Sequence, residues 1–207
     1  MPVTIDGTTG ITTPAENTAA LTVGSITGIL KATSGVVAQA VAGTDYLTST
    51  SGGTITLATS QSAVGATNID FTSIPSWAKQ ITVNFRTVAS QSGVTAAKQI
   101  QLGTSSGIVA SGYTGTIEGS SLSVGFTYDN SSSSGSIING SVILTLVDSS
   151  TNTWCCFGVT GRSDAAGGFK LAGSVVLPST LTTVRISSTS GSAPSFSAGT
   201  VNIVYQG

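Results

Sequence analysis

The chain has 207 residues, and only 7% of them are charged, against about 25% in an ordinary soluble domain. The formal net charge is −1 and no basic tract occurs, which argues against a phosphate-tracking surface and predicts no nucleic-acid partner. Histidine is absent, so the commonest metal ligand and the usual general base at neutral pH are both missing. A hydrophobic fraction of 39% favours a folded chain over a disordered one.

Residues 1–53 form the first predicted region, an extended N-terminal attachment or shaft segment. Short apolar pieces such as Val3-Thr4-Ile5 are separated by turn residues, so apolar side chains are too sparse to build an independent core. The opening residues lack the pattern of a Sec signal, and no apolar stretch approaches the roughly 20 residues of a membrane span. We therefore expect no membrane insertion, and an arm that becomes ordered against other chains.

Residues 54–207 form the second predicted region, because longer and more regular strand patterns begin after a Ser/Gly-rich linker at 49–53. The best of them is 79–88, where Ile81, Val83 and Phe85 alternate with polar residues. Residues 141–147 are apolar on both faces, which predicts a central strand covered by two layers. The predicted strands are 54–58, 64–71, 79–88, 98–102, 121–127, 137–147, 153–160, 169–176, 181–188 and 200–205.

Many short strands with turns every 8–15 residues and no helix of three turns predict an all-β fold. The expected architecture is a β-sandwich of the jelly-roll kind, following the extended arm.

The chemistry of the chain favours a non-enzymatic role. No Gly-x-Ser-x-Gly elbow occurs, and without histidine a serine triad lacks its usual base. Cys155 and Cys156 are neighbours whose side chains point to opposite faces of a strand, so they predict no disulfide, metal or redox site. We expect no catalytic residue, metal or cofactor. A glycosidase built on two carboxylates stays open, because partner carboxylates meet only in the fold.

Three residues are candidates for contact with a surface glycan. Tyr113 lies in the turn Ser111–Gly115, where an exposed aromatic ring would stack on a sugar; simple packing is the favoured alternative. Arg162 and Asp164 lie in the glycine-rich loop 161–168 and offer charged groups to a polar ligand; a solvated loop is the favoured alternative. The loop 129–135 is the other candidate binding segment. For Trp77, core packing is favoured over a role as a ligand platform.

Four segments carry a resemblance to a known class of proteins. The opening Val3–Pro14 resembles the start of many phage tail-fibre and virion fibre proteins, and 28–47, which ends in Gly-Thr-Asp-Tyr-Leu, looks like a fibre-shaft segment. The stretch Phe71–Val83, with its Ile-Pro-Ser-Trp element, resembles a strand-opening motif of phage β-sandwich tips. The ending Phe196–Tyr205 is similar to the last strand of such tips.

The resemblance implies a virion protein on the surface of a phage particle. It implies a homotrimer that attaches to a tail, baseplate or capsid protein through its N-terminal arm and presents a C-terminal knob for host attachment. The short tail fibre is the first reading, a capsid decoration or head fibre the second, and a glycan depolymerase the third.

Overall fold

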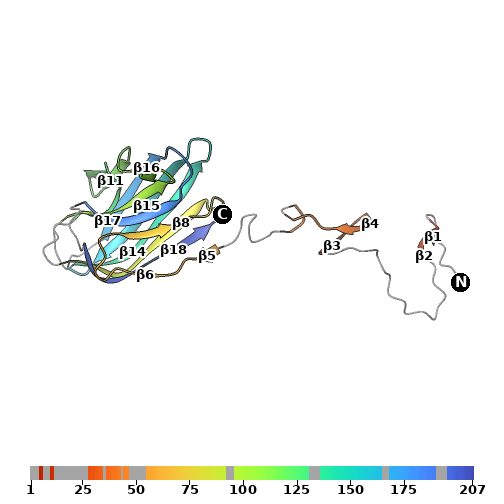
Figure 1. Cartoon of the computed structure of the whole chain (residues 1–207), viewed down its shortest axis with the longest axis horizontal. Helices are drawn as coiled ribbons and strands as arrows, with labels where there is room; N and C mark the ends of the chain where they lie inside the picture. The colour runs from red at the N-terminus through yellow and green to blue at the C-terminus, as the bar shows by residue number, and fades with distance from the viewer. Residues whose placement is uncertain are drawn as a thin grey trace. The chain divides into compact units, whose positions relative to one another are not determined.

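The computed structural model describes residues 5–6, 10–11, 28–34, 36–42, 44–46, 55–91, 96–130, 136–164, 168–189 and 195–207. The chain divides into two compact units, Met1–Tyr46 and Leu47–Gly207 (Figure 1). The described residues contain strands and turns and no helix, which confirms the all-β prediction.

The first unit contains two small antiparallel hairpins. They are formed by β1 (Ile5–Asp6) with β2 (Gly10–Ile11), and by β3 (Leu30–Thr33) with β4 (Val36–Gln39). An ion pair of 2.8 Å joins Lys31 to Asp45. Among the residues of this unit whose exposure is described, only Ala40 is buried, whereas Ile29 and Val41 are 54% and 56% exposed. The described part of this unit therefore has no hydrophobic core of its own.

The second unit is a sandwich of two antiparallel sheets. The larger sheet has nine strands in the order β12-β11-β16-β15-β14-β8-β18-β5, with β6 also paired to β18. Its strands are β5 (Ile55–Leu57), β6 (Gln61–Ser62), β8 (Gln80–Ser90), β11 (Thr114–Ile117), β12 (Ser120–Ser121), β14 (Ile137–Asp148), β15 (Thr153–Arg162), β16 (Gly168–Val176) and β18 (Phe196–Gln206).

The smaller sheet has five strands in the order β10-β9-β17-β7, with β13 paired to β9. Its strands are β7 (Ile69–Thr72), β9 (Lys98–Thr104), β10 (Gly107–Ile108), β13 (Phe126–Asp129) and β17 (Thr183–Ser188). The core lies between the two sheets, where the Phe85 and Tyr128 rings stack with centroids 4.2 Å apart. Each of the ten predicted strand segments overlaps an observed strand, although several of the observed strands begin or end a few residues from the predicted bounds.

Two departures from the predicted strands have a local cause. The segment predicted at 64–71 becomes a strand only at Ile69, because Val64 and Gly65 form a turn in which Gly65 has a φ of +72°. The strand β18 begins earlier than predicted because a bulge lets it continue past Gly199. At that position φ is +93° and a side-chain carbon would lie 2.3 Å from the Thr87 carbonyl oxygen.

The prediction that 141–147 is covered by two layers is wrong. The segment lies in β14, which is central in the larger sheet, and its inward residues Val142 and Leu144 are fully buried. On the opposite side Val147 is 61% exposed, and Phe157 on the neighbouring strand is 55% exposed. The smaller sheet covers one side only, so the described part of the chain leaves the other side open.

Candidate functional site

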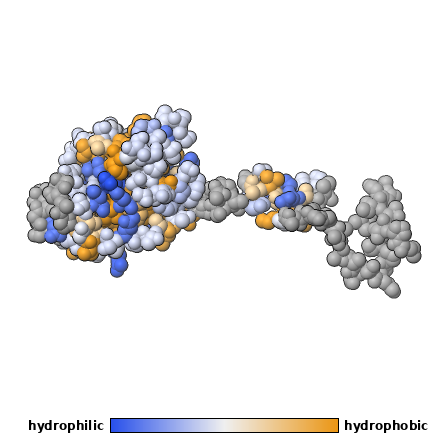
Figure 2. All heavy atoms as spheres, in the orientation of Figure 1, coloured by the Kyte–Doolittle hydropathy of each residue, from blue (hydrophilic) through white to orange (hydrophobic). Residues whose placement is uncertain are grey.

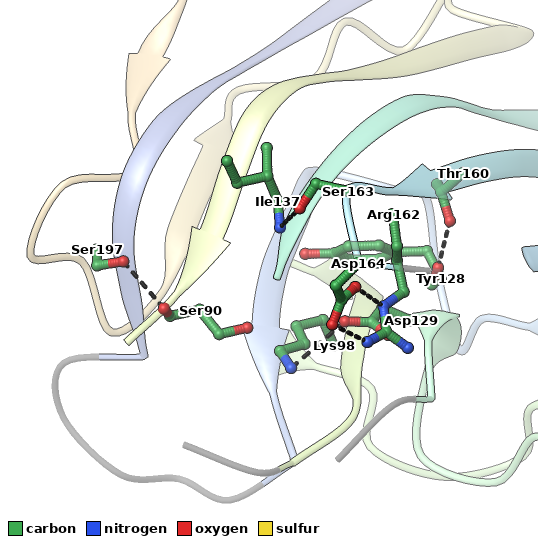
Figure 3. A network of polar contacts seen from close by, with 10 residues as sticks. All are labelled: Ser90, Lys98, Tyr128, Asp129, Ile137, Thr160, Arg162, Ser163, Asp164 and Ser197. Atoms are coloured by element: carbon green, nitrogen blue, oxygen red, sulfur yellow. Dashed lines mark hydrogen bonds and ion pairs between the residues drawn. The ribbon is translucent and has the colours of Figure 1, made fainter. Parts of the chain in front are cut away.

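Arg162 and Asp164 contact each other at the end of β15. The Arg162 guanidinium donates to both carboxylate oxygens of Asp164, with N···O distances of 2.9 and 2.6 Å (Figure 3). Its carbon Cζ also lies 5.6 Å from the centre of the Phe169 ring. Only 11% of the Arg162 side chain is exposed, against 40% for Asp164. The guanidinium is therefore held in place by its neighbours, and the carboxylate is the more accessible group of the pair.

The expectation that Tyr113 is an exposed stacking ring is wrong, because the structure buries it to 3% exposure. Its hydroxyl accepts a hydrogen bond from the Leu102 amide at 2.8 Å and donates to the Val109 carbonyl at 3.1 Å. Its ring meets Phe126 edge to face, with centroids 4.9 Å apart. Burial raises the pKa of Tyr113 to about 12, so the hydroxyl stays protonated. The residue ties the turn to the smaller sheet, and we assign it no ligand.

The two loops named as binding candidates are only partly described. Residues 131–135 and 165–167 lie outside the described residues, so the predictions for 129–135 and 161–168 remain predictions there. Nearby, the Ser163 hydroxyl accepts a hydrogen bond from the Ile137 amide at 3.1 Å, which joins the ends of β14 and β15.

A buried ion pair that sequence reasoning missed lies in the same end of the sandwich. Lys98 and Asp129 are cross-strand partners on β9 and β13, with side chains 2% and 0% exposed and an N···O distance of 3.4 Å. Within the described part of the chain, the ammonium group and the Tyr128 hydroxyl make no hydrogen bond. Burial, and to a lesser extent the charge of Asp129, raises the pKa of Tyr128 well above its usual range.

One sequence signal would have placed Lys98 inside. Lys98 stands two residues before Ile100 and four before Leu102, in the phase of residues that face the core. A charge taken out of water needs a partner, and the bulge between Thr127 and Asp129 brings the carboxylate opposite the lysine. That bulge is a property of strand pairing and leaves no mark in the sequence.

The outer side of the nine-stranded sheet carries a continuous line of side chains without charge. The strand register places them one beside another across seven strands, from β5 at one edge to β11. We call this line the uncharged row, and its members are Leu57, Val204, Thr82, Ile143, Phe157, Ala172 and Thr116. Beside it, a shallow depression of about 470 Å³ is lined by residues that include Ile143, Phe157, Val159 and Lys170.

Two further features of the described residues concern metal binding and small cavities. They contain no group of three cysteine or carboxylate residues that would hold a metal ion. A second pocket, between Ile74, Trp154 and Leu181, has a volume of about 20 Å³, room for about one water molecule. Trp77 packs edge to face on Tyr205 with centroids 6.5 Å apart, in keeping with the packing role favoured for it.

Comparison with known proteins gives no match. No protein-family model, curated protein or solved structure matches the chain. A search of the described residues for a helix long and apolar enough to cross a membrane finds none.

Proposed function

We propose that the chain is a non-enzymatic phage virion protein, a short trimeric tail fibre. Its N-terminal segment is the extended arm that attaches to a tail, baseplate or capsid protein. Its C-terminal sandwich, of the jelly-roll kind, is the knob that meets the host surface. The basis in sequence is the resemblance of four segments to phage fibres and the scarcity of charge.

One observation carries the proposal furthest, the contrast in burial between the two units. The Leu47–Gly207 unit has a core with many fully buried aliphatic and aromatic residues. In the Met1–Tyr46 unit, Ile29, Leu30 and Val41 are about half exposed, although ordering each residue costs roughly 1–2 kcal/mol of backbone entropy. Contact with other chains buries such side chains, and an attachment arm supplies that contact.

The proposed ligand of the knob is a host-surface glycan. Its contacts are assigned to Asp164 and the adjoining loops, with Arg162 positioning the carboxylate. A carboxylate accepts hydrogen bonds from sugar hydroxyls, and three knobs in one trimer raise the effective concentration of weak sites. Tyr113 has no part in this site because it is buried.

The experiment is to purify the full chain, measure its mass by light scattering, and measure its adsorption to host cells. A threefold mass and adsorption that Asp164→Ala weakens are the expected results. A monomer that does not adsorb contradicts the proposal.

The alternatives have their own readouts. Gold-labelled antibody on intact particles places the protein on the tail or, for a capsid decoration or head fibre, on the head. Release of soluble sugar from host polysaccharide identifies a depolymerase instead.

A further inference from the structure

We propose that the uncharged row is the surface on which the knob packs against a second copy of this chain. The inference rests on the proposed oligomer but not on its place in a virion. It assigns the contact between knobs to one sheet face, whereas the proposed function assigned assembly to the arm.

The exposure of the apolar side chains is the first argument. Leu57, Phe157 and Val159 are 69%, 55% and 54% exposed. They are not scattered singly, because the register joins the Leu57 and Phe157 strands through Val204 and Ile143 into one row. Thr82 stands between Val204 and Ile143, so the row is uncharged throughout and apolar in most of its members. A grouping of exposed apolar side chains of this kind marks an interaction surface.

The chemistry of the patch favours protein over sugar as its occupant. Sugar recognition relies on polar groups and aromatic platforms. Here the only aromatic ring in the row is Phe157, and Asn84 beside the row already accepts a hydrogen bond from the Ser141 hydroxyl at 2.7 Å. Apolar side chains and few charges are what the core of a subunit interface contains.

The distribution of charge favours a second copy of the same chain. The row itself contains no charged residue, so bringing two copies together buries no ion there. Charged residues stand beside the row at its β11–β16 end: Lys170, the cross-strand neighbour of Val159 at the margin of the depression, and Glu118, whose carboxylate accepts a hydrogen bond from the Lys170 amide at 2.8 Å. A lysine at a margin keeps its ammonium in water while its methylene groups cover apolar surface.

The size of the face fits a tethered contact. Five neighbouring long strands, about 4.8 Å apart and with about six residues each at 3.3 Å, span on the order of 500 Å² before side-chain relief. A stable interface between free proteins uses about 800 Å² from each partner. The face is therefore close to, and somewhat below, what a free dimer needs. Membership of one trimer, as proposed above, raises the effective concentration of the copies and makes up such a deficit.

A thiol close to the row provides the test. Cys155 lies on the outer side of β15, two residues from Phe157, and is partly exposed in the single chain. Cys156 is buried, which raises the pKa of its thiol to about 12, so it stays unreactive at neutral pH. Labelling with a maleimide at neutral pH therefore reports on Cys155 alone.

The experiment compares the full-length protein with Val159→Lys and Val204→Lys, which place charges at two separate points of the face. The matched control is Val64→Lys, because Val64 is 67% exposed in the turn after β6 and is not a member of the uncharged row. All four proteins are checked for mass by light scattering and for folding by circular dichroism. Both face variants should label about tenfold faster at Cys155 than the wild type and the control, a factor that corresponds to 1.4 kcal/mol of lost contact.

Each other outcome counts against the inference in a distinguishable way. Equal labelling of Cys155 in an oligomeric wild type and both face variants overturns the inference and leaves the proposed oligomer standing. Faster labelling in Val159→Lys alone shows a local effect on the adjacent thiol and also overturns it. A monomeric wild type overturns both the inference and the proposed assembly.

Discussion

On the outer side of the five-stranded sheet, Asp70, Arg185 and Gln101 lie side by side across three strands. The Arg185 guanidinium donates to both oxygens of Asp70 at 2.7 Å, and the Ser187 hydroxyl donates to Gln101 at 3.0 Å. On the outer side of the nine-stranded sheet, the corresponding line is the uncharged row, in which Phe157 is 55% exposed. Figure 2 shows hydrophilic and hydrophobic patches on one side of the Leu47–Gly207 unit.

The difference shows how one sandwich treats its two outer faces. The polar line pairs its own charges and amides, so its hydrogen-bonding groups have partners within the chain. The apolar side chains of the uncharged row have no hydrogen bonds or ion pairs to make. Their free energy falls only when their surface is moved out of water. The three residues of the polar line are paired within a single chain, whereas the uncharged row gains from contact with another chain. Four predictions test this contrast between groups satisfied inside the chain and groups left open.

The largest expected effect is on the buried ion pair. Lys98→Met leaves the Asp129 carboxylate without its ion-pair partner in the interior, and removal of one partner from a buried pair costs about 3–5 kcal/mol. Urea unfolding monitored by circular dichroism measures the loss. The matched double variant, Lys98→Met with Asp129→Leu, should recover part of the stability because no lone charge remains. A double variant less stable than the single one would contradict this account.

The two sides of β14 should differ in their sensitivity to truncation. Leu144→Ala removes a fully buried side chain and should lower the free energy of unfolding by about 2–5 kcal/mol. Val147→Ala, on the open side and 61% exposed, should change it by less than about 0.5 kcal/mol. Denaturant midpoints of the two variants give the comparison. Similar losses at both positions would show that the Val147 side chain is buried as deeply as Leu144 is.

Alkaline pH should unfold the Leu47–Gly207 sandwich through its buried thiol and phenols. The folded pKa of Cys156 is raised from about 9 to about 12, so its stabilising effect is complete below pH 9 and is lost as the pH rises toward 12. In that window the thiol lowers stability by about 1.4 kcal/mol per pH unit. Cys156→Ala should therefore make the free energy of unfolding fall less steeply with pH in this window, by the contribution of one titrating proton. An unchanged slope would mean that the thiol ionises as readily in the folded chain as in the unfolded one.

The smallest expected effect is on the polar line. Asp70 holds the pKa of Arg185 above its usual value, but the two side chains are 33% and 30% exposed and solvent screens their attraction. Arg185→Gln should therefore cost no more than about 1 kcal/mol, and less in high salt. Thermal unfolding at low and high ionic strength measures it. A loss of several kcal/mol that salt does not change would show that the pair behaves as a buried one.

Residue alternation was enough to predict long strands such as β8 and the side that faces the core. Ile81, Val83 and Phe85 repeat every second position, and such a period leaves only one way to bury them against a second sheet. The short strand β11 (Thr114–Ile117) was not predicted, because Thr-Gly-Thr-Ile contains too few apolar residues to show a period. For the candidate contacts, the sequence placed Arg162 and Asp164 near each other, while their bidentate pairing came from the structure.

Composition and residue spacing were enough to predict an all-β fold and alternating strands in the C-terminal part of the chain. These properties depend on composition and on local spacing along the chain, so they do not depend on which other segments pack against it. The burial of Tyr113, the pairing of Lys98 with Asp129 and the open face of β14 in the single chain could be read only from the folded structure. Each of these depends on which strand lies beside or above another, and that choice is made by pairing between residues far apart in the sequence.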